Sequence, residues 1–264
     1  MKQLFACITS AIVLTACGGG ADSPAKAPTS VVSAPPVAPA PPTSPACVPK
    51  QVRIAALGDS TNYAIDGSVD LTIKYAADGS IDPSTIFWWD ARAQAPHSPP
   101  IELQALMDAQ FGPGNVIVDN LAVPGYTAEM VVNAMTGADP TLTPINLAGY
   151  DVIFENLEVN DKNGGFPLAV YKTNILRMNP TIVETGIPSA LGDPREDAYN
   201  DTVRSLGIPV VDVDKYVKSL PNWQQYYPDP ASAHVTDALY KMIADNVLAP
   251  AVAKQVAPLR CVTL

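Results

Sequence analysis

Histidine and cysteine are scarce in this sequence, and acidic residues outnumber basic ones. The chain of 264 residues has 2 histidines and 4 cysteines, and 16 Lys and Arg stand against 26 Asp and Glu. A metal cluster of the usual histidine and cysteine ligands is therefore not expected. No basic cluster is visible, so we do not expect nucleic acid as a partner. A phosphate-binding loop, a dinucleotide fingerprint and internal repeats are also missing from the sequence.

Residues 1–16 have the pattern of a signal peptide. A basic start precedes an apolar run that is too short to span a membrane as a stable helix. The segment 14–18 (Leu-Thr-Ala-Cys-Gly) resembles the processing box of bacterial lipoproteins. The resemblance implies that Cys17 becomes the lipidated first residue, and Gly18 after it resembles lipoproteins sorted to the outer membrane. The alternative is an ordinary secretory signal with an incidental cysteine. In both cases the chain is exported, and lipidation would anchor it to the bacterial cell envelope.

Residues 17–46 consist mostly of Gly, Ala, Ser, Pro and Thr. Such a segment cannot bury enough apolar surface to fold, and its prolines favour an extended, semi-rigid chain. We therefore predict a disordered tether here, followed by one folded domain at 47–264. A chain of that length can bury a sizeable core.

Two cysteines remain for the folded domain. Cys7 leaves with the signal peptide and Cys17 is used for the lipid. The two that remain, Cys47 and Cys261, lie near the two ends of the domain. In an oxidising compartment this pair predicts a disulfide that joins the termini. Closing so long a loop would stabilise the fold by about 4 kcal/mol in the chain-entropy model. The alternative is two unpaired thiols.

Short apolar runs alternate with helical patterns through the domain. The predicted strands are 52–57, 115–120, 151–154, 181–185 and 209–213; the predicted helices are 101–111, 127–135, 167–178, 194–206 and 235–249, with Pro250 ending or kinking the last. This alternation predicts an α/β fold with a parallel five-stranded sheet covered on both faces. Residues 63–100 have mixed signals and predict a small hairpin or irregular insertion.

The segment Gly58-Asp59-Ser60 follows the first predicted strand. In open α/β sheets, ligands bind at the carboxyl ends of the strands. Ser60, presented there after a glycine that permits a sharp turn, is a candidate nucleophile. The alternative is a loop serine that caps the next element, because Gly, Asp and Ser are ordinary turn residues.

Three further residues supply what a serine nucleophile needs. Acyl transfer requires a base, for which imidazole is suited near neutral pH, and donors aimed at the developing oxyanion. His234 opens the last predicted helix, whereas the other histidine, His97, lies in a proline-rich loop without a strand end beside it. Gly125 and Asn160 follow the second and third predicted strands. The backbone N–H groups of Ser60 and Gly125 and the amide of Asn160 would provide three donors.

These four blocks, in this order and at these strand ends, resemble the SGNH (GDSL-type) hydrolases from Val52 to the last helix. The resemblance implies a flavodoxin-like three-layer α/β/α sandwich and an esterase or lipase mechanism without a cofactor. It implies that Ser60 is the nucleophile and first oxyanion donor, that Gly125 and Asn160 are the other donors, and that His234 is the base.

Two positions depart from the pattern of this family. Glu158 stands where the family usually has a glycine, two residues before the asparagine. Its carboxylate either lines the substrate pocket or points to solvent. Ala231 stands where the family usually has an aspartate, three residues before the histidine. Asp229, five residues before it, either orients the imidazole as a third catalytic residue or leaves a Ser60–His234 dyad held by backbone carbonyls.

We interpret the chain as an exported, lipid-anchored serine esterase for small-molecule or polysaccharide esters with acetyl or short acyl groups. Glu158 and Trp88 are expected near the substrate, although burial against the sheet is the alternative for Trp88. Two other functions use the same four blocks. One is a non-catalytic glycan-binding module, which the two departures favour; the other is an acyltransferase that uses the same serine.

Overall fold

The computed structural model describes residues 47–87, 91–185, 189–190, 197–208, 210–230 and 232–264. The predicted signal peptide, the tether and Cys17 lie outside this range, as does Trp88. Residues 46–264 form one compact unit. None of the helices in the described ranges combines the length and hydrophobicity needed to cross a bilayer.

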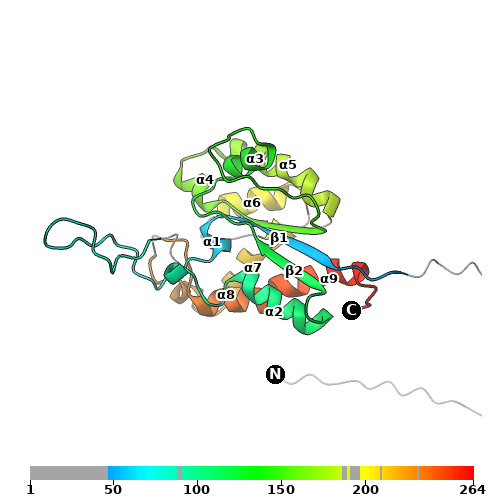
Figure 1. Ribbon diagram of the computed structural model, residues 1–264. Helices are drawn as coiled ribbons and strands as arrows, with labels where there is room; N and C mark the ends of the chain where they lie inside the picture. Colours follow the sequence, from blue (N-terminus) through cyan, green and yellow to red (C-terminus); the bar gives the residue numbers. More distant parts are fainter. Residues whose placement is uncertain (1–46, 88–90, 186–188, 191–196, 209, 231) are drawn as a thin grey trace, which may run out of the picture. The chain divides into compact units, whose positions relative to one another are not determined.

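Three parallel strands form the centre of the fold (Figure 1). They are β1 (Val52–Gly58), β2 (Val116–Asn120) and β3 (Val152–Asn156), in the order β2-β1-β3. The central strand β1 is almost wholly buried, as expected for an apolar strand that is covered on both faces. Its Ile54 lies opposite Val118 on one side and Val152 on the other. This register places the carboxyl ends of all three strands at one edge.

A second parallel pair continues the strand pattern. It consists of β4 (Ser189–Ala190) and β5 (Val210–Val211), and β4 contacts β3. Five parallel strands are thus present in the described ranges, as a group of three and a group of two, and four of them lie where we predicted a strand. The fourth predicted strand, 181–185, is wrong because α5 (Leu168–Thr185) continues through it. The β-branched residues there favour strands, but that preference is weak and depends on the tertiary surroundings.

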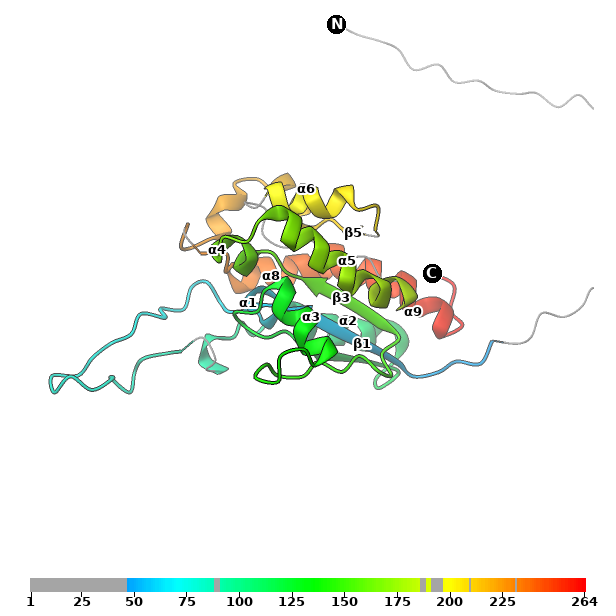
Figure 2. The same ribbon diagram turned by 90° about the horizontal axis from the view of Figure 1, so that it is seen from above.

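Helices cover the sheet in two layers (Figures 1 and 2). One layer contains α2 (Pro99–Phe111), α8 (Asp237–Ile243), η3 (Ala244–Leu248) and α9 (Ala249–Leu259); the other contains α3 (Ala128–Thr136), α5 and α6 (Asp197–Ser205). Helix α2 packs on β2, and β3 contacts both α5 and α9, one from each layer. The predicted three-layer α/β/α architecture is confirmed.

Five shorter helices complete the described ranges. They are α1 (Ser60–Tyr63), α4 (Val159–Asn163), α7 (Val213–Ser219), η1 (Ala91–Ala93) and η2 (Trp223–Tyr226). The last helical run is longer than predicted. It passes through the π-helical turn η3 and continues in α9, where Pro250 occupies the first turn, a position at which proline costs little.

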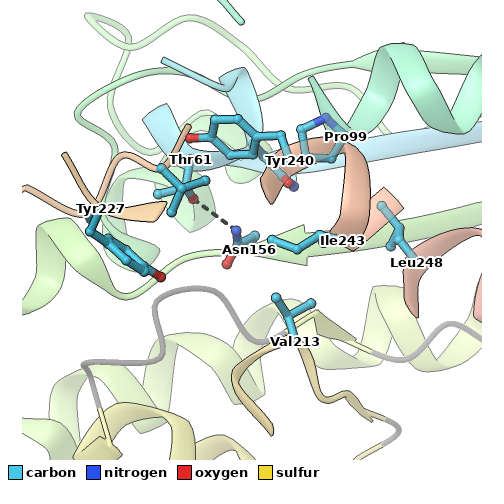
Figure 3. Close-up of a pocket in the computed structure, with 11 residues that line it drawn as sticks. Thr61, Pro99, Asn156, Val213, Tyr227, Tyr240, Ile243 and Leu248 are labelled. Carbon is cyan, nitrogen blue, oxygen red and sulfur yellow. Dashed lines mark hydrogen bonds between the residues drawn. The ribbon is translucent and has the colours of Figure 1, made fainter. Parts of the chain in front are cut away.

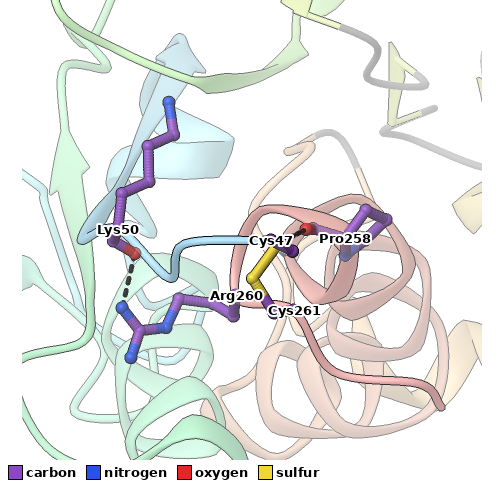
Figure 4. The surroundings of a disulfide bond; sticks show 5 residues. All are labelled: Cys47, Lys50, Pro258, Arg260 and Cys261. Atoms are coloured by element: carbon purple, nitrogen blue, oxygen red, sulfur yellow. Dashed lines mark hydrogen bonds between the residues drawn. A yellow bond between two sulfur atoms is a disulfide. The ribbon is translucent and has the colours of Figure 1, made fainter. Parts of the chain in front are cut away.

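A disulfide joins the two ends of the described domain, as predicted (Figure 4). It links Cys47 to Cys261 across 214 residues of sequence. Beside it, the guanidinium of Arg260 donates a hydrogen bond to the carbonyl oxygen of Lys50. The N-terminal segment is therefore fixed to the end of α9 immediately before β1 begins.

Residues 66–87 project from the domain as an irregular extension (Figures 1 and 2). An antiparallel bridge between Tyr75 and Ile81 closes its far end, and the base of the extension borders a cleft that also contains His234. The prediction of a hairpin or irregular insertion beside the site is confirmed for this segment.

Candidate active site

The turn after β1 depends on a glycine. Gly58 has a φ of +153°, and a Cβ added to it would lie 2.6 Å from the carbonyl oxygen of Asn156 and 2.9 Å from Cβ of Asn62. Because side chains rarely adopt this φ and no space is available, only glycine fits here. The end of β1 consequently lies directly against the end of β3.

Asp59 fixes the conformation of the next residues. Its Oδ1 accepts hydrogen bonds from the backbone N–H of Thr61 at 2.8 Å and from the Thr61 hydroxyl at 2.7 Å. The amide of Asn156 in turn donates to the Thr61 hydroxyl oxygen at 2.9 Å. This network places Ser60 as the first residue of α1, at the carboxyl edge of the sheet.

Ser60 and His234 lie within hydrogen-bonding distance although 174 residues separate them in the sequence. Nε2 of His234 is 2.9 Å from Oγ of Ser60. The histidine belongs to the segment between η2 and α8, which two backbone hydrogen bonds hold in place: Gly67 N–H donates to Val235 O at 2.9 Å, and Thr236 N–H donates to Tyr226 O at 2.9 Å. The base of the extension therefore takes part in positioning the imidazole.

The second ring nitrogen of His234 has a neighbour that the sequence did not indicate. Oγ of Ser232 lies 3.1 Å from Nδ1, and the same oxygen accepts a hydrogen bond of 3.1 Å from the backbone N–H of His234. The only trace of this contact in the sequence is a serine two residues before the histidine. That spacing also occurs in ordinary turns and does not by itself indicate a contact with the ring. Asp229, which we predicted as the third catalytic residue, lines the same cleft, and its backbone carbonyl accepts a hydrogen bond of 3.0 Å from Ser232 N–H.

The two other predicted donors lie close to the nucleophile turn. The amide nitrogen of Asn160 donates to the carbonyl of Tyr126 at 3.0 Å and to Oδ2 of Asp59 at 3.3 Å. Gly125 precedes Tyr126 and has a φ of +84°, with no atom within 4 Å of an added Cβ. The structure thus gathers all four predicted segments at one edge of the sheet.

Glu158 has a backbone conformation that suits glycine. Its φ is +147°, and the residue is only 1% exposed, so its carboxylate does not point to solvent. A non-glycine residue held in such a region costs on the order of 1–3 kcal/mol. The loop therefore holds a glutamate in a backbone conformation that favours glycine.

Two buried aspartates beside the site hold their protons more firmly than usual. Burial raises the pKa of Asp59 to about 6, against the opposing effect of its hydrogen bonds with Thr61. Burial likewise raises the pKa of Asp161 to about 6, although its Oδ2 accepts a hydrogen bond of 2.9 Å from Ala128 N–H. Both residues connect the nucleophile turn and the Asn160 loop to the sheet and to α3.

A cleft of about 390 Å³, with both polar and apolar side chains in its walls, opens beside the imidazole. Its lining residues are Asp66, Gly67, Val69, Asp70, Leu71, Thr72, Asp229, Ser232 and His234. Hydrogen bonds from Thr72, and then the ammonium of Lys74, lower the pKa of Asp70 to about 2, so this wall is negatively charged at neutral pH. In the described ranges, no group of three or more His, Cys, Asp and Glu side chains is arranged to hold a metal ion.

A smaller apolar cavity lies behind the nucleophile turn (Figure 3). Its volume is about 30 Å³, and its lining includes Thr61, Asn156, Tyr227, Tyr240 and Ile243. Figure 3 shows the hydrogen bond between Asn156 and Thr61 at its edge. A space of this size holds at most about one water molecule. This cavity is therefore too small to hold an ester substrate.

Comparisons with known proteins give structural similarity only. No protein-family model and no curated protein matches the sequence. The fold is similar to LAE5, an α/β hydrolase from the metagenome of Lake Arreo, at 17% identity and a TM-score of 0.49, covering 80% of this chain and 98% of that one. It is also similar to a lipase/acylhydrolase from Enterococcus faecalis at 14% identity and a TM-score of 0.48, covering 78% and 95%. An acetylxylan esterase from Geobacillus stearothermophilus, Axe2, is similar at 15% identity and a TM-score of 0.48, covering 79% and 95%.

Proposed function

We propose that this protein is a serine esterase of the SGNH type that hydrolyses acetyl or short acyl esters. The observation that carries the proposal is the 2.9 Å contact between Ser60 Oγ and His234 Nε2 at the carboxyl edge of a parallel sheet. A serine hydroxyl is a weak nucleophile unless an adjacent base accepts its proton, and this pairing supplies that base.

The reaction follows from this geometry. Nε2 of His234 accepts the proton of Ser60 as Oγ attacks the ester carbonyl carbon and a tetrahedral oxyanion forms. The intermediate then collapses, and the imidazolium returns the proton to the departing alcohol, which leaves an acyl group on Ser60. A water molecule, deprotonated by the same nitrogen, then attacks this acyl group. The bond between the acyl carbon and Ser60 Oγ breaks, Oγ takes the proton back from the imidazolium, and the acid is released.

Backbone N–H groups of Ser60 and Gly125 and the amide of Asn160 are the proposed oxyanion donors. No atom lies within 4 Å of a Cβ added to Gly125, so this side of the turn is open. The amide of Asn160 makes its longer hydrogen bond, of 3.3 Å, with Asp59. We propose that the amide N–H of Asn160 that now binds Asp59 turns toward the oxyanion during the reaction. The hydrogen bond from the same amide nitrogen to Tyr126 O keeps the side chain in place.

The charge of the cleft points to neutral substrates. Asp66, Asp70 and Asp229 lie along its walls, so an anionic ester would be repelled while the hydroxyl groups of a sugar would find acceptors. We therefore propose an acetylated or short-acylated carbohydrate, or a small neutral ester, as the substrate class.

The location is part of the proposal. We propose that residues 1–16 direct export, that Cys17 carries a lipid anchored in the outer membrane, and that residues 17–46 form the tether. Metabolic labelling with a palmitate analogue in a bacterial host tests this. Label should appear in the wild-type chain and be lost in Cys17→Ala; equal labelling of both would contradict the anchor.

Hydrolysis of p-nitrophenyl acetate tests the enzymatic function. The wild-type protein should release p-nitrophenol, Ser60→Ala should lose this activity, and Ser80→Ala, which changes an exposed turn serine in the extension, should keep it. The absence of Ser60-dependent hydrolysis on short, long and sugar esters would favour a non-catalytic glycan-binding module. A product that forms only with an added alcohol acceptor would favour an acyltransferase.

A further inference from the structure

The second nitrogen of the proposed base faces a neutral hydroxyl. Nδ1 of His234 lies 3.1 Å from Oγ of Ser232, while Nε2 of the same ring lies 2.9 Å from Oγ of Ser60. In a Ser-His-Asp triad a carboxylate binds this second nitrogen, selects the tautomer and stabilises the imidazolium. The imidazole here is placed between two serine hydroxyls.

The hydrogen bonds around Ser232 are compatible with the Nδ1–H tautomer of His234. Its Oγ accepts a hydrogen bond of 3.1 Å from the backbone N–H of His234, which leaves a second lone pair and one proton on the hydroxyl. When Nδ1 carries the ring proton, that second lone pair accepts it. Nε2 then keeps a lone pair directed at the hydroxyl proton of Ser60, which is the arrangement that general-base catalysis needs.

The backbone holds the Ser232 hydroxyl in this place. Ser232 N–H donates to Asp229 O at 3.0 Å, and Gly67 N–H donates at 2.9 Å to the carbonyl oxygen of Val235, the residue after His234. The serine and the imidazole are therefore both attached to a loop whose two sides are anchored. A side chain with one rotatable torsion at such a position loses little freedom when it binds the ring.

We propose, on the basis of the esterase function above, that Ser232 is the positioning residue of His234 and takes the place of the carboxylate in this site. Ser232 holds the ring in the Nδ1–H tautomer without contributing a charge. A hydrogen bond to a neutral acceptor is roughly half as strong as one to an ion, so this imidazolium is stabilised less than one bound to aspartate. The titratable groups that line the cleft with the ring are Asp66, Asp70 and Asp229.

Kinetics distinguish Ser232 from Asp229 as the partner of the ring. With p-nitrophenyl acetate, Ser232→Ala should lower kcat about tenfold with little change in KM, the effect of one lost hydrogen bond in the transition state. Ser232→Thr, which keeps the hydroxyl, should recover much of the rate. Ser232→Asp should raise the pKa of the acidic limb of kcat/KM, because a carboxylate then faces the ring. Asp229→Asn should not reproduce the loss of kcat seen in Ser232→Ala, and the control Ser80→Ala should leave both kcat and that limb in place.

Nuclear magnetic resonance of histidine gives a readout that does not require activity. The chain has only His97 and His234, so two sets of ring signals are expected. Nδ1 of His97 contacts the carboxylate of Glu102, which makes His97 an internal reference with a charged partner. Neutral His234 should be the Nδ1–H tautomer in the wild type and shift toward Nε2–H in Ser232→Ala, with the His97 signals unchanged.

Three results would overturn the proposal: a wild-type His234 that is the Nε2–H tautomer, a Ser232→Ala variant with unchanged tautomer and unchanged kcat, or an Asp229→Asn variant that reproduces both the tautomer shift and the loss of kcat. If the wild type shows no Ser60-dependent hydrolysis but Ser232→Ala still changes the tautomer, the positioning role is supported and the esterase function fails.

Discussion

Gly67 and His234 lie so close together that a Cβ on the glycine would be 2.3 Å from the histidine carbonyl oxygen. The neighbouring backbone of Val235 accepts a hydrogen bond from Gly67 N–H at 2.9 Å. The position of the His234 imidazole, the proposed base, thus depends on a residue of the extension, far away in the sequence.

Gly67→Ala should therefore reduce catalysis more than it reduces stability. The added methyl group must push the His234 segment away, and a displacement of about 1 Å at a catalytic group can cost on the order of a hundredfold in rate. We expect a lower kcat on p-nitrophenyl acetate with a retained unfolding transition.

The control is Gly79→Ala in the same extension. Gly79 has a φ of +83° but no atom within 4 Å of an added Cβ, so the substitution introduces backbone strain without a clash. Equal activity in the wild type, Gly67→Ala and Gly79→Ala would show that the extension does not position the histidine.

The buried aspartates predict how stability changes with pH. The pKa of Asp59 and that of Asp161 are each raised from 3.8 to about 6, so the folded state binds more protons than the unfolded state between these values. The free energy of unfolding should therefore fall as pH rises from about 4 to 6, by on the order of 3 kcal/mol per group. His97, whose pKa is raised by its bond to Glu102, acts with the same sign at higher pH.

Urea unfolding at a series of pH values checks this dependence. Asp161→Asn keeps an oxygen for Ala128 N–H and should flatten the fall between pH 4 and 6. Asp139→Asn is the control, because hydrogen bonds from Thr141 lower the pKa of this exposed group, which therefore acts below that window. A wild-type free energy that rises across the window would contradict the assignment.

Glu158→Gly should stabilise the protein. The substitution removes a positive-φ strain of about 1–3 kcal/mol. This gain exceeds the cost of about 0.5–1 kcal/mol that glycine adds through its conformational freedom in the unfolded chain. It also removes a buried carboxylate from the sheet edge. Urea titration should show a higher midpoint than in the wild type.

Glu158→Gln serves as the control for backbone strain. It removes the charge and keeps the side chain, so any gain from the glycine variant beyond that of Gln is due to the backbone. A lower midpoint for Glu158→Gly than for Glu158→Gln would mean that the φ of +147° is not a source of strain.

The disulfide should contribute to stability without affecting the site. Cys47 and Cys261 close a loop of 214 residues, and the double substitution by serine should lower the free energy of unfolding by up to about 4 kcal/mol. Activity of the folded variant should stay at the wild-type level. A wild-type protein whose unfolding midpoint is unchanged by reductant would contradict this contribution.

The sequence predicted the gathering of Ser60, Gly125, Asn160 and His234 because each follows or precedes a regular element whose position in an α/β sheet is set by topology. Parallel strands bring their carboxyl ends to one edge, so residues distant in the chain meet there. The distance between Ser60 and His234 follows from that rule and from the loop before α8.

Other features could not be predicted from local patterns. Ser232 contacts the ring through the conformation of an irregular loop, and a serine in such a loop has no distinctive signal. The predicted strand at 181–185 became the end of α5 because β-branched residues indicate a strand only weakly. The conformation of Glu158 is also unexpected, since its φ is set by the loop rather than by the residue.

Mapping the adduct of a fluorophosphonate probe tests the Ser60–His234 mechanism most directly. The probe reacts with a serine that a neighbouring base activates, so the wild type should carry one adduct on Ser60 and His234→Asn should react much more slowly. An adduct on any other residue, or labelling of Ser60 at the same rate in His234→Asn, would contradict the mechanism.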